Sequence, residues 1–164
     1  MKKIRVLVVG MGNMGLSHAR AYKSIPDFEI AGLCSRGIEE RKDIAAEFPG
    51  VPAYADYAEA LKATKPDAVS INTWPDTHAA YAKMALNAGC HIFIEKPLAG
   101  TVAEAEEIAA LAKAKGLKLV IGYILRVQET SEIDVTSRGA LAVLAAWPVR
   151  RWVTAAGAAL AVAL

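Results

Sequence analysis

The sequence predicts an α/β fold, with a doubly wound parallel sheet between two layers of helices. Apolar runs of strand length alternate with segments of helical period, which is the order of successive βαβ units. Hydrophobic residues make up 54% of the chain and charged residues 22%, a balance that suits a sheet covered on both faces. A length of 164 residues is typical of a single core.

Six strands are expected, in an order that alternates with helices. The apolar runs that predict them cover residues 4–9, 29–34, a short stretch near 53, 68–72, 91–94 and 117–121. Val and Ile are frequent in these runs, and Gly, Pro or charged residues bound them. Each pair of successive runs leaves room for a crossover helix, so a three-layer α/β/α arrangement is predicted.

The helix before the last strand has a start signal and a stop signal. Thr101 and Glu104 have the spacing of a capping box, in which each side chain accepts a hydrogen bond from a backbone amide of the first turn. Lys113 and Gly116 are typical of the other end, where a cation faces the helix dipole and glycine adopts a positive φ.

The preceding helix is predicted to end at Gly89. Apolar residues recur in it at intervals of three and four, and this stripe is expected to pack in the core. Its members are Tyr81, Met84, Ala85 and Ala88.

Charge and cysteine usage exclude several classes of function. The net charge of +2 is small and the basic residues are scattered, so no nucleic-acid partner is expected. Cys34 and Cys90 stand far apart without a CxxC, which argues against disulfides and zinc and favours a cytoplasmic protein. The apolar stretch 153–164 is much shorter than the roughly 20 residues that span a bilayer, so no membrane segment is expected.

A glycine-rich turn, Gly10-Met11-Gly12-Asn13-Met14-Gly15, follows the first strand and opens the first helix. This is the context of the Rossmann dinucleotide fingerprint. Gly10 permits the tight turn, Gly12 lets the backbone approach a diphosphate, and Gly15 lets the helix pack closely on the strand. The free amides at the start of the helix, with Asn13 and Met14, are expected to face the phosphates. The sequence therefore predicts a dinucleotide site.

The end of the second strand favours NADP over NAD, while NAD stays possible. An NAD enzyme usually has an acid there that binds the ribose hydroxyls. Here the residues are Ser35 and Arg36, whose hydroxyl and guanidinium suit a 2′-phosphate. Arg41 lies about one turn further on as a second candidate, and the alternative is that Arg36 and Arg41 are ordinary surface charges.

Three further segments resemble one enzyme family. They are Glu95-Lys96-Pro97 after the fifth strand, Asn72-Thr73-Trp74-Pro75-Asp76-Thr77-His78 after the fourth, and Gly122-Tyr123-Ile124-Leu125-Arg126 after the sixth. Together with the glycine turn, they are similar to the glucose-fructose oxidoreductase, inositol dehydrogenase and rhizopine-catabolism (Gfo/Idh/MocA) family. The match runs through about Arg126, and Trp74 stands where proline is more usual in the family.

The resemblance implies a hydride-transfer site at the carboxyl edge of the sheet. Lys96 would be the catalytic residue, placed to hydrogen-bond the substrate hydroxyl and stabilise a developing alkoxide. The other residues implied at the cofactor cleft are Asn72, Thr73, Trp74, His78, Glu95 and Arg126.

Simpler roles stay open for several of these residues. Lys96 could be a strand-end lysine paired with Glu95, and Trp74 could be buried packing. His78 is expected in the first turn of the following helix. His18, on the first helix, has no evident partner in the sequence, so a metal site is not supported. Pro97 could fix its turn through a cis bond.

The expected domains are a dinucleotide-binding domain over residues 1–126 and an atypical apolar tail over 127–164, where ten of the last 25 residues are alanine. A helix is expected near 129–137. Full-length family members continue into a substrate domain, so the tail is interpreted as a truncation or a remnant.

Two functions remain open. One is the cofactor half of an NADP-dependent oxidoreductase acting on a sugar, inositol or related polyol. The other is a non-catalytic dinucleotide-binding or interaction module. Apolar surface left uncovered without a substrate domain predicts a homo-oligomer that assembles through the tail.

Overall fold

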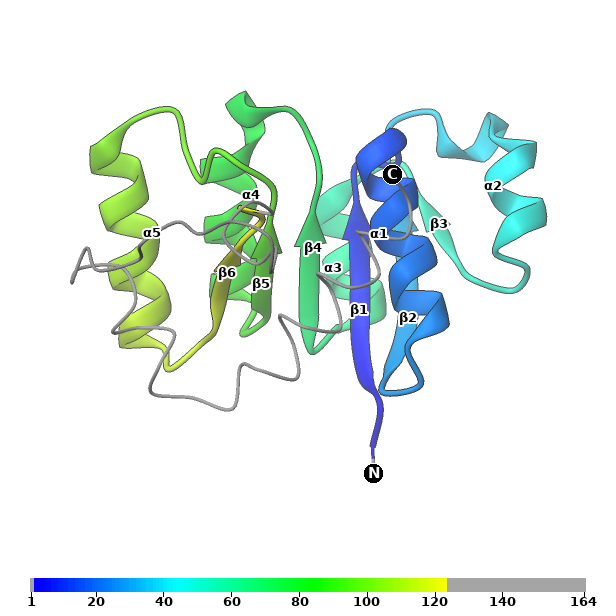
Figure 1. Ribbon diagram of the computed structural model, residues 1–164, viewed down its shortest axis with the longest axis horizontal. Coiled ribbons are helices and arrows are strands. Elements are labelled where there is room, and N and C mark those ends of the chain that lie inside the picture. The colour runs from blue at the N-terminus through cyan, green and yellow to red at the C-terminus, as the bar shows by residue number, and fades with distance from the viewer. Residues whose placement is uncertain (1, 124–164) are drawn as a thin grey trace, which may run out of the picture. The chain divides into compact units, whose positions relative to one another are not determined.

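The computed structural model describes residues 2–123, which form a six-stranded parallel sheet with helices on both faces (Figure 1). The spatial order is β3-β2-β1-β4-β5-β6, the doubly wound order of a Rossmann fold, which confirms the predicted fold class. The strands are β1 Ile4–Val9, β2 Phe28–Cys34, β3 Ala53–Tyr54, β4 Ala68–Ile71, β5 His91–Ile94 and β6 Leu119–Ile121. The predicted runs therefore agree with the strands to within two residues at their ends.

The helices divide between the two faces of the sheet. Their bounds are α1 Asn13–Ser24, the 3₁₀ turn η1 Ile38–Glu40, α2 Lys42–Glu47, α3 Tyr57–Thr64, α4 Pro75–Asn87 and α5 Val102–Ala114. Helices α1 and α2 bury their apolar residues in one core, and α3, α4 and α5 bury theirs in another (Figure 1). The switch of faces follows from the strand order: the crossovers from β1 to β3 and those from β3 to β6 step along the sheet in opposite directions, and right-handed crossovers then place their helices on opposite faces.

Strand β1 shows how the sequence builds both cores. Val6 and Val8 point into the core of α1 and α2, whereas Leu7 and Val9 point into the core of α3 to α5. All four are almost fully buried. Each such side chain contributes about 1.5–3 kcal/mol by leaving water, so this central strand anchors the loop that follows it.

The predicted helix ends are confirmed. Thr101 Oγ1 accepts a hydrogen bond from the Glu104 amide at 3.2 Å, and Glu104 Oε2 accepts one from the Thr101 amide at 3.1 Å. Gly116 follows α5 with a φ of 64°, and Gly89 follows α4 with a φ of 82°. These left-handed residues are easy for glycine, so the chain turns back to the sheet after each helix.

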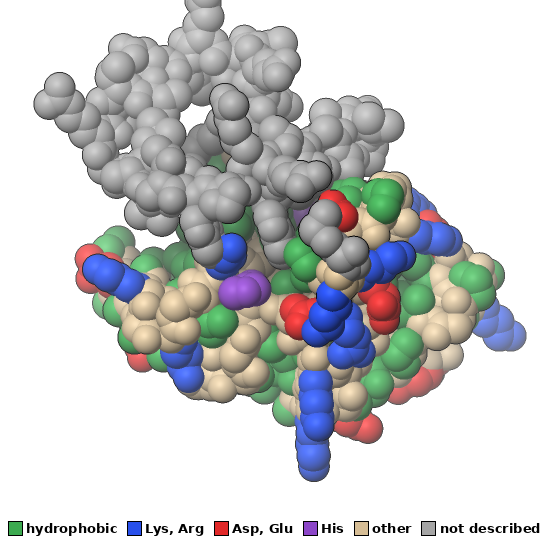
Figure 2. Space-filling model, turned by 90° about the horizontal axis from the view of Figure 1, so that it is seen from below, with side chains coloured by type: hydrophobic (Ala, Val, Ile, Leu, Met, Phe, Trp, Pro, Cys, Tyr) green, Lys and Arg blue, Asp and Glu red, His purple; other side chains and the backbone are tan. Residues whose placement is uncertain are grey.

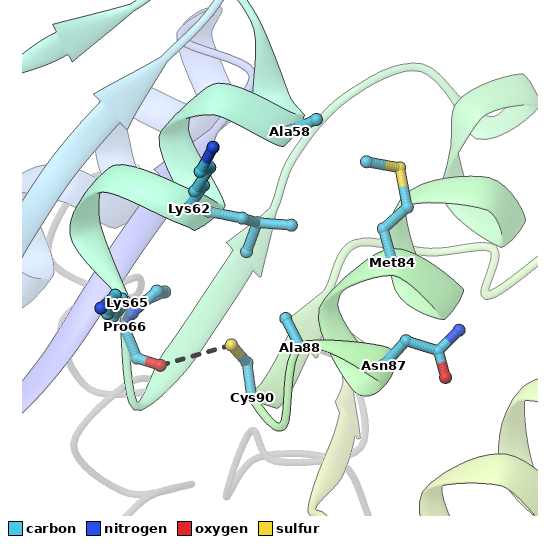
Figure 3. Close-up of a pocket in the computed structure, with 9 residues that line it drawn as sticks. Ala58, Lys62, Lys65, Pro66, Met84, Asn87, Ala88 and Cys90 are labelled. Carbon is cyan, nitrogen blue, oxygen red and sulfur yellow. Dashed lines mark hydrogen bonds between the residues drawn. The ribbon is translucent and has the colours of Figure 1, made fainter.

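The apolar stripe predicted on α4 is only partly buried. Ala85 lies in the core, but Met84 and Ala88 are exposed. They border a shallow depression of about 670 Å³ between α3 and α4 (Figure 3). There Cys90 Sγ donates to the carbonyl of Pro66 at 3.3 Å. The buried face of α4 instead uses Ala79, Ala82, Ala85 and Leu86.

The depression lies at the amino ends of β4 and β5, because Pro66 lies two residues before β4 and Cys90 directly precedes β5. Seen from this edge, basic and acidic side chains of the described residues are interspersed (Figure 2). Lys2 pairs with Asp67 and Arg5 with Glu29 nearby. Each of these two basic residues therefore has an acidic partner at this edge.

Within residues 2–123 there is no helix both long and apolar enough to cross a bilayer. The helix expected near 129–137 and the tail of 127–164 lie outside the described residues.

Candidate dinucleotide site at the carboxyl edge of the sheet

Strand β1 runs upward from the N-terminus in Figure 1, so the carboxyl ends of all six parallel strands lie at the upper edge. The loops after β1, β2, β4 and β5 contain the residues that the sequence singled out. Since β1, β4 and β5 are neighbours, the glycine turn, the Thr73 loop and Lys96 share one stretch of this edge.

The glycine turn has the geometry that its sequence predicts. Gly10 has a φ of +86°, and a Cβ there would lie 2.7 Å from the carbonyl oxygen of Asn72. A Cβ on Gly15 would collide with the carbonyl oxygen of Gly10, so α1 approaches β1 as closely as a backbone can. At Gly12, by contrast, a Cβ would meet nothing within 4 Å. The space beside Gly12 is open from the solvent side.

Helix α1 begins at this open space. No side chain caps its first turn, and that turn holds no acidic residue. The first amides of a helix have no acceptors within the helix, and the dipole favours an anion there. Asn13 and Met14 are exposed beside these amides. A diphosphate fits this place, because it would accept hydrogen bonds from the amides and approach the bare backbone of Gly12.

The turn after β2 holds the residues predicted to bind a 2′-phosphate. The Ser35 amide donates to the Tyr54 carbonyl at 3.0 Å, which fixes the turn, and Arg36 is exposed on it. Arg41 lies beyond η1 and forms a two-pronged ion pair with Asp43, at 2.8 Å and 2.7 Å. The Arg41 hydrogen bonds lower the pKa of Asp43 to about 2. Arg41 therefore differs from Arg36 as a candidate phosphate ligand, because its guanidinium already pairs with the Asp43 carboxylate.

Glu95 is buried at the end of β5, and its partner is His18 on α1. His18 Nε2 lies 2.9 Å from Glu95 Oε1, with 2% and 9% of the two side chains exposed. The expectation that His18 has no partner is thus wrong. Glu95 Oε2 accepts from the Lys96 amide at 3.3 Å. The ion pairs found within residues 2–123 do not include Lys96, whose side chain is exposed beside this carboxylate.

Two effects oppose each other in setting the pKa of Glu95. Burial raises the pKa, but the hydrogen bond from His18 and the charges of His18 and Lys96 outweigh it, so the pKa lies below its ordinary value. Glu95 is therefore ionised and accepts hydrogen bonds only. A Cβ on Gly122 would lie 3.0 Å from Glu95 Oε1, so the glycine after β6 leaves room for this carboxylate.

His78 lies in the first turn of α4, as expected, but it is fully buried. Its Nδ1 lies 2.6 Å from the carbonyl oxygen of Pro97, and its Nε2 lies 3.0 Å from that of Thr73. His78 therefore joins the loop after β4 to the turn after β5. The Lys96–Pro97 bond is cis.

The residues before His78 divide between structural and exposed ones. Asn72 Nδ2 donates to the carbonyls of Ser70 and Val9 at 3.1 Å and 3.3 Å, which ties β4 to β1. Thr73 Oγ1 accepts from Thr77 Oγ1 at 2.7 Å. Trp74 is 78% exposed, so the alternative of a buried packing role is wrong. An indole this exposed at the edge of the site is free to contact a ligand.

The local signal for His18 was present but weak. His18 follows Gly15 by three residues, which places both on the helix face that meets the sheet. Its partner, however, lies 77 residues away. A charged residue at the end of a buried strand, such as Glu95, needs a partner, and that need was the second signal.

Comparison with known proteins decides the family. Residues 4–123 match the Gfo/Idh/MocA family, described as an oxidoreductase family with an NAD-binding Rossmann fold. The chain belongs to this family. The predicted resemblance is thereby confirmed, and the matched residues end close to the end of β6.

The relatives of this chain include sugar and inositol dehydrogenases. It is 38% identical to the UDP-N-acetylglucosamine 3-dehydrogenase of Acidithiobacillus ferrooxidans, over 76% of this chain and 38% of that one. It is 30% identical to the NADP(+) scyllo-inositol 2-dehydrogenase of Bacillus subtilis, over 71% and 36% of the two chains. The apo scyllo-inositol dehydrogenase of Lactobacillus casei superimposes with a TM-score of 0.70 at 28% identity, over 77% and 38%. The chain thus spans less than two fifths of each relative.

Of the predicted site residues, Arg126 lies outside the described ones. Within residues 2–123, no three His, Cys, Asp or Glu side chains are gathered where they could hold a metal ion.

Proposed function

We propose that this chain is the cofactor-binding half of an oxidoreductase that transfers a hydride between NADP and a carbinol carbon of a sugar, an inositol or a related polyol. The observation that supports it most is one stretch of sheet edge, formed by β1, β4 and β5. It combines an uncapped helix start, the open space at Gly12 and the exposed Lys96.

The cofactor, when bound, supplies the atom that accepts or returns the hydride. In the oxidative direction a carbinol would become a carbonyl: its hydride would pass to the oxidised nicotinamide, and its hydroxyl proton would pass to solvent water. Lys96 would donate a hydrogen bond to that oxygen and offset its negative charge as the proton leaves. Its ammonium suits this role because the carboxylate of the preceding residue, Glu95, is already paired with His18.

The preference for NADP rests on the turn after β2. Ser35 and Arg36 are the residues at that strand end, and neither is an acid. A guanidinium binds a phosphate through a pair of charge-assisted hydrogen bonds. A neutral ribose hydroxyl cannot form such a pair with it. Arg41 is the weaker candidate, because it would have to leave Asp43. The Bacillus subtilis relative bears NADP(+) in its name, which agrees with this preference.

Titration with NADPH and NADH tests the proposal. The NMR signals of the backbone amides of residues 10–15 and 35–36 should shift, and NADPH should bind more tightly than NADH. If neither nucleotide moves the signals of residues 10–15, the proposal fails. A panel of sugars and inositols with NADP⁺ then tests turnover through the absorbance of the reduced nicotinamide.

A second candidate is a dinucleotide-binding or interaction module without catalysis. It is favoured by the extent of the match, since residues 4–123 correspond to the dinucleotide-binding part of the family alone. Binding of NADPH without turnover on any substrate of the panel would support this candidate over the first.

A further inference from the structure

The residue before Lys96 is fixed by a buried histidine. His18, on α1, lies 2.9 Å from Glu95 Oε1, and the other oxygen of that carboxylate accepts from the Lys96 amide at 3.3 Å. A ring contact with Phe93, at 4.8 Å between centroids, packs the imidazole against β5. The first turn of the same helix faces the open space beside Gly12.

The residue after Lys96 is fixed by a second buried histidine. His78, on α4, faces the Pro97 carbonyl at 2.6 Å and the Thr73 carbonyl at 3.0 Å. Carbonyl oxygens only accept hydrogen bonds, so whichever ring nitrogen carries the proton has an acceptor. His78 thereby links the loop after β4 to the turn that follows Lys96.

We propose that His18 and His78 are positioning residues that fix the backbone of Lys96 from both sides and so direct its side chain to the nicotinamide end of the site. The inference rests on the role proposed for Lys96. Lys96 itself is exposed and has four rotatable side-chain bonds, so only its backbone can be fixed in advance. When the residues of a site are held in place before the ligand binds, less binding free energy is lost in ordering them.

This arrangement predicts a selective effect on the two ends of the ligand. The adenosine and diphosphate parts would contact the glycine turn and the turn after β2. The side-chain hydrogen bonds of the two histidines go instead to Glu95, Pro97 and Thr73, which belong to neither turn. The nicotinamide part depends on Lys96. Removing a histidine should therefore weaken the binding of NADPH. It should not weaken the binding of 2′-phospho-ADP-ribose, which lacks the nicotinamide.

The test compares His18→Leu and His78→Leu with the unmodified chain by calorimetric titration of both ligands. We expect the Kd for NADPH to rise about three- to tenfold, which is what one net hydrogen bond is worth, while that for 2′-phospho-ADP-ribose changes less than about twofold. His18→Gln and His78→Gln, which keep a donor, should restore much of the difference. His91→Gln is the matched control, since the third histidine of the chain lies at the opposite edge and accepts from the Lys118 amide.

Gly122→Ala is a milder second variant, for use if a leucine variant does not fold. Its Cβ would lie 3.0 Å from Glu95 Oε1 and displace that carboxylate without removing a buried group. The same selective loss is expected. Equal losses for both ligands, or equal affinities of the unmodified chain for both, would overturn the inference. Failure of the unmodified chain to bind either ligand would instead overturn the proposed function.

Discussion

At the scale of single residues, two glycines of the turn after β1 should respond differently to alanine. At Gly15 the new methyl would collide with the Gly10 carbonyl, so Gly15→Ala should destabilise the fold by about 1–3 kcal/mol. At Gly12 the methyl meets nothing within 4 Å, so Gly12→Ala should lower Tm less but weaken dinucleotide binding. Thermal melts and titrations separate the two effects. Similar Tm losses for both variants would contradict this assignment.

The glycine turn was predictable because everything that defines it is local. Gly10, Gly12 and Gly15 stand within six residues after a strand, and each spacing has its own steric reason. The pair of His18 and Glu95 was not predictable, because it depends on how α1 packs across 77 residues of chain. Lys96 was identified through the resemblance, and the exposure of Trp74 became clear only from the structure.

Arg36 is expected to discriminate between the two nicotinamide cofactors. Arg36→Asp would set a carboxylate against the 2′-phosphate, so the Kd for NADPH should rise about tenfold or more while that for NADH changes much less. Arg41→Asp is the comparison, because Arg41 is paired with Asp43 and should matter less. Competitive titrations of both nucleotides measure the ratio. An equal loss for NADPH and NADH would remove Arg36 from the site.

The pair of His18 and Glu95 should also affect how the stability of the fold changes in acid. The pKa of Glu95 in the fold lies below its ordinary value of 4.5, so the folded state favours the charged carboxylate. Its contribution is fully present above that ordinary value and is lost as the pH falls through the lower, folded value. Glu95→Gln should therefore show a shallower loss of Tm below about pH 4.5. Glu39→Gln, at an exposed site, should follow the unmodified chain; identical curves for Glu95→Gln would contradict the prediction.

At the scale of secondary structure, capping signals were more reliable than apolar stripes. The capping box of Thr101 and Glu104 is formed as predicted, because its partners are three residues apart and need no tertiary contact. The stripe on α4 was partly wrong, because alanines rather than the larger Met84 face the core. Where a helix lies close to a sheet, small residues occupy the contact, and periodicity alone does not show which of two apolar faces is buried.

Removal of the α5 cap gives a test at this scale. Thr101→Ala would leave the Glu104 amide without its side-chain acceptor and should cost about 1 kcal/mol, a Tm decrease of about 3–5 °C. Thr101→Ser keeps the hydroxyl and should restore most of this. Because the hydrogen bonds of this cap lie within the first turn of α5, affinity for 2′-phospho-ADP-ribose should stay unchanged. A Tm unaffected by Thr101→Ala would show that the cap contributes nothing.

At the scale of the whole molecule, three exposed apolar side chains share one edge. Met14, Trp74 and Val102 are 41%, 78% and 76% exposed, and they stand at the starts of α1, α4 and α5. Helices of a parallel sheet begin at its carboxyl edge, so these residues lie at the same edge as the candidate site. Apolar residues that gather at one edge are typical of a surface that another protein surface covers.

We therefore expect the chain to associate with itself. Sedimentation velocity should show a dimer or a larger species at micromolar concentration, and Trp74→Ser should shift it toward the monomer. Met84→Ser, an exposed apolar residue at the opposite edge, is the control. A monomer at every concentration would exclude the association.

The two cysteine thiols offer a last consequence of how the sheet is packed. Burial raises the pKa of Cys34 to about 12 and that of Cys90 to about 11, and both lie in the core beneath α3 and α4. Alkylating reagents attack the thiolate, so the native protein should be almost inert to them at neutral pH. These are the only cysteines in the sequence. The rate at which such a reagent is slowly incorporated would therefore measure how often the core beneath α3 and α4 opens to water.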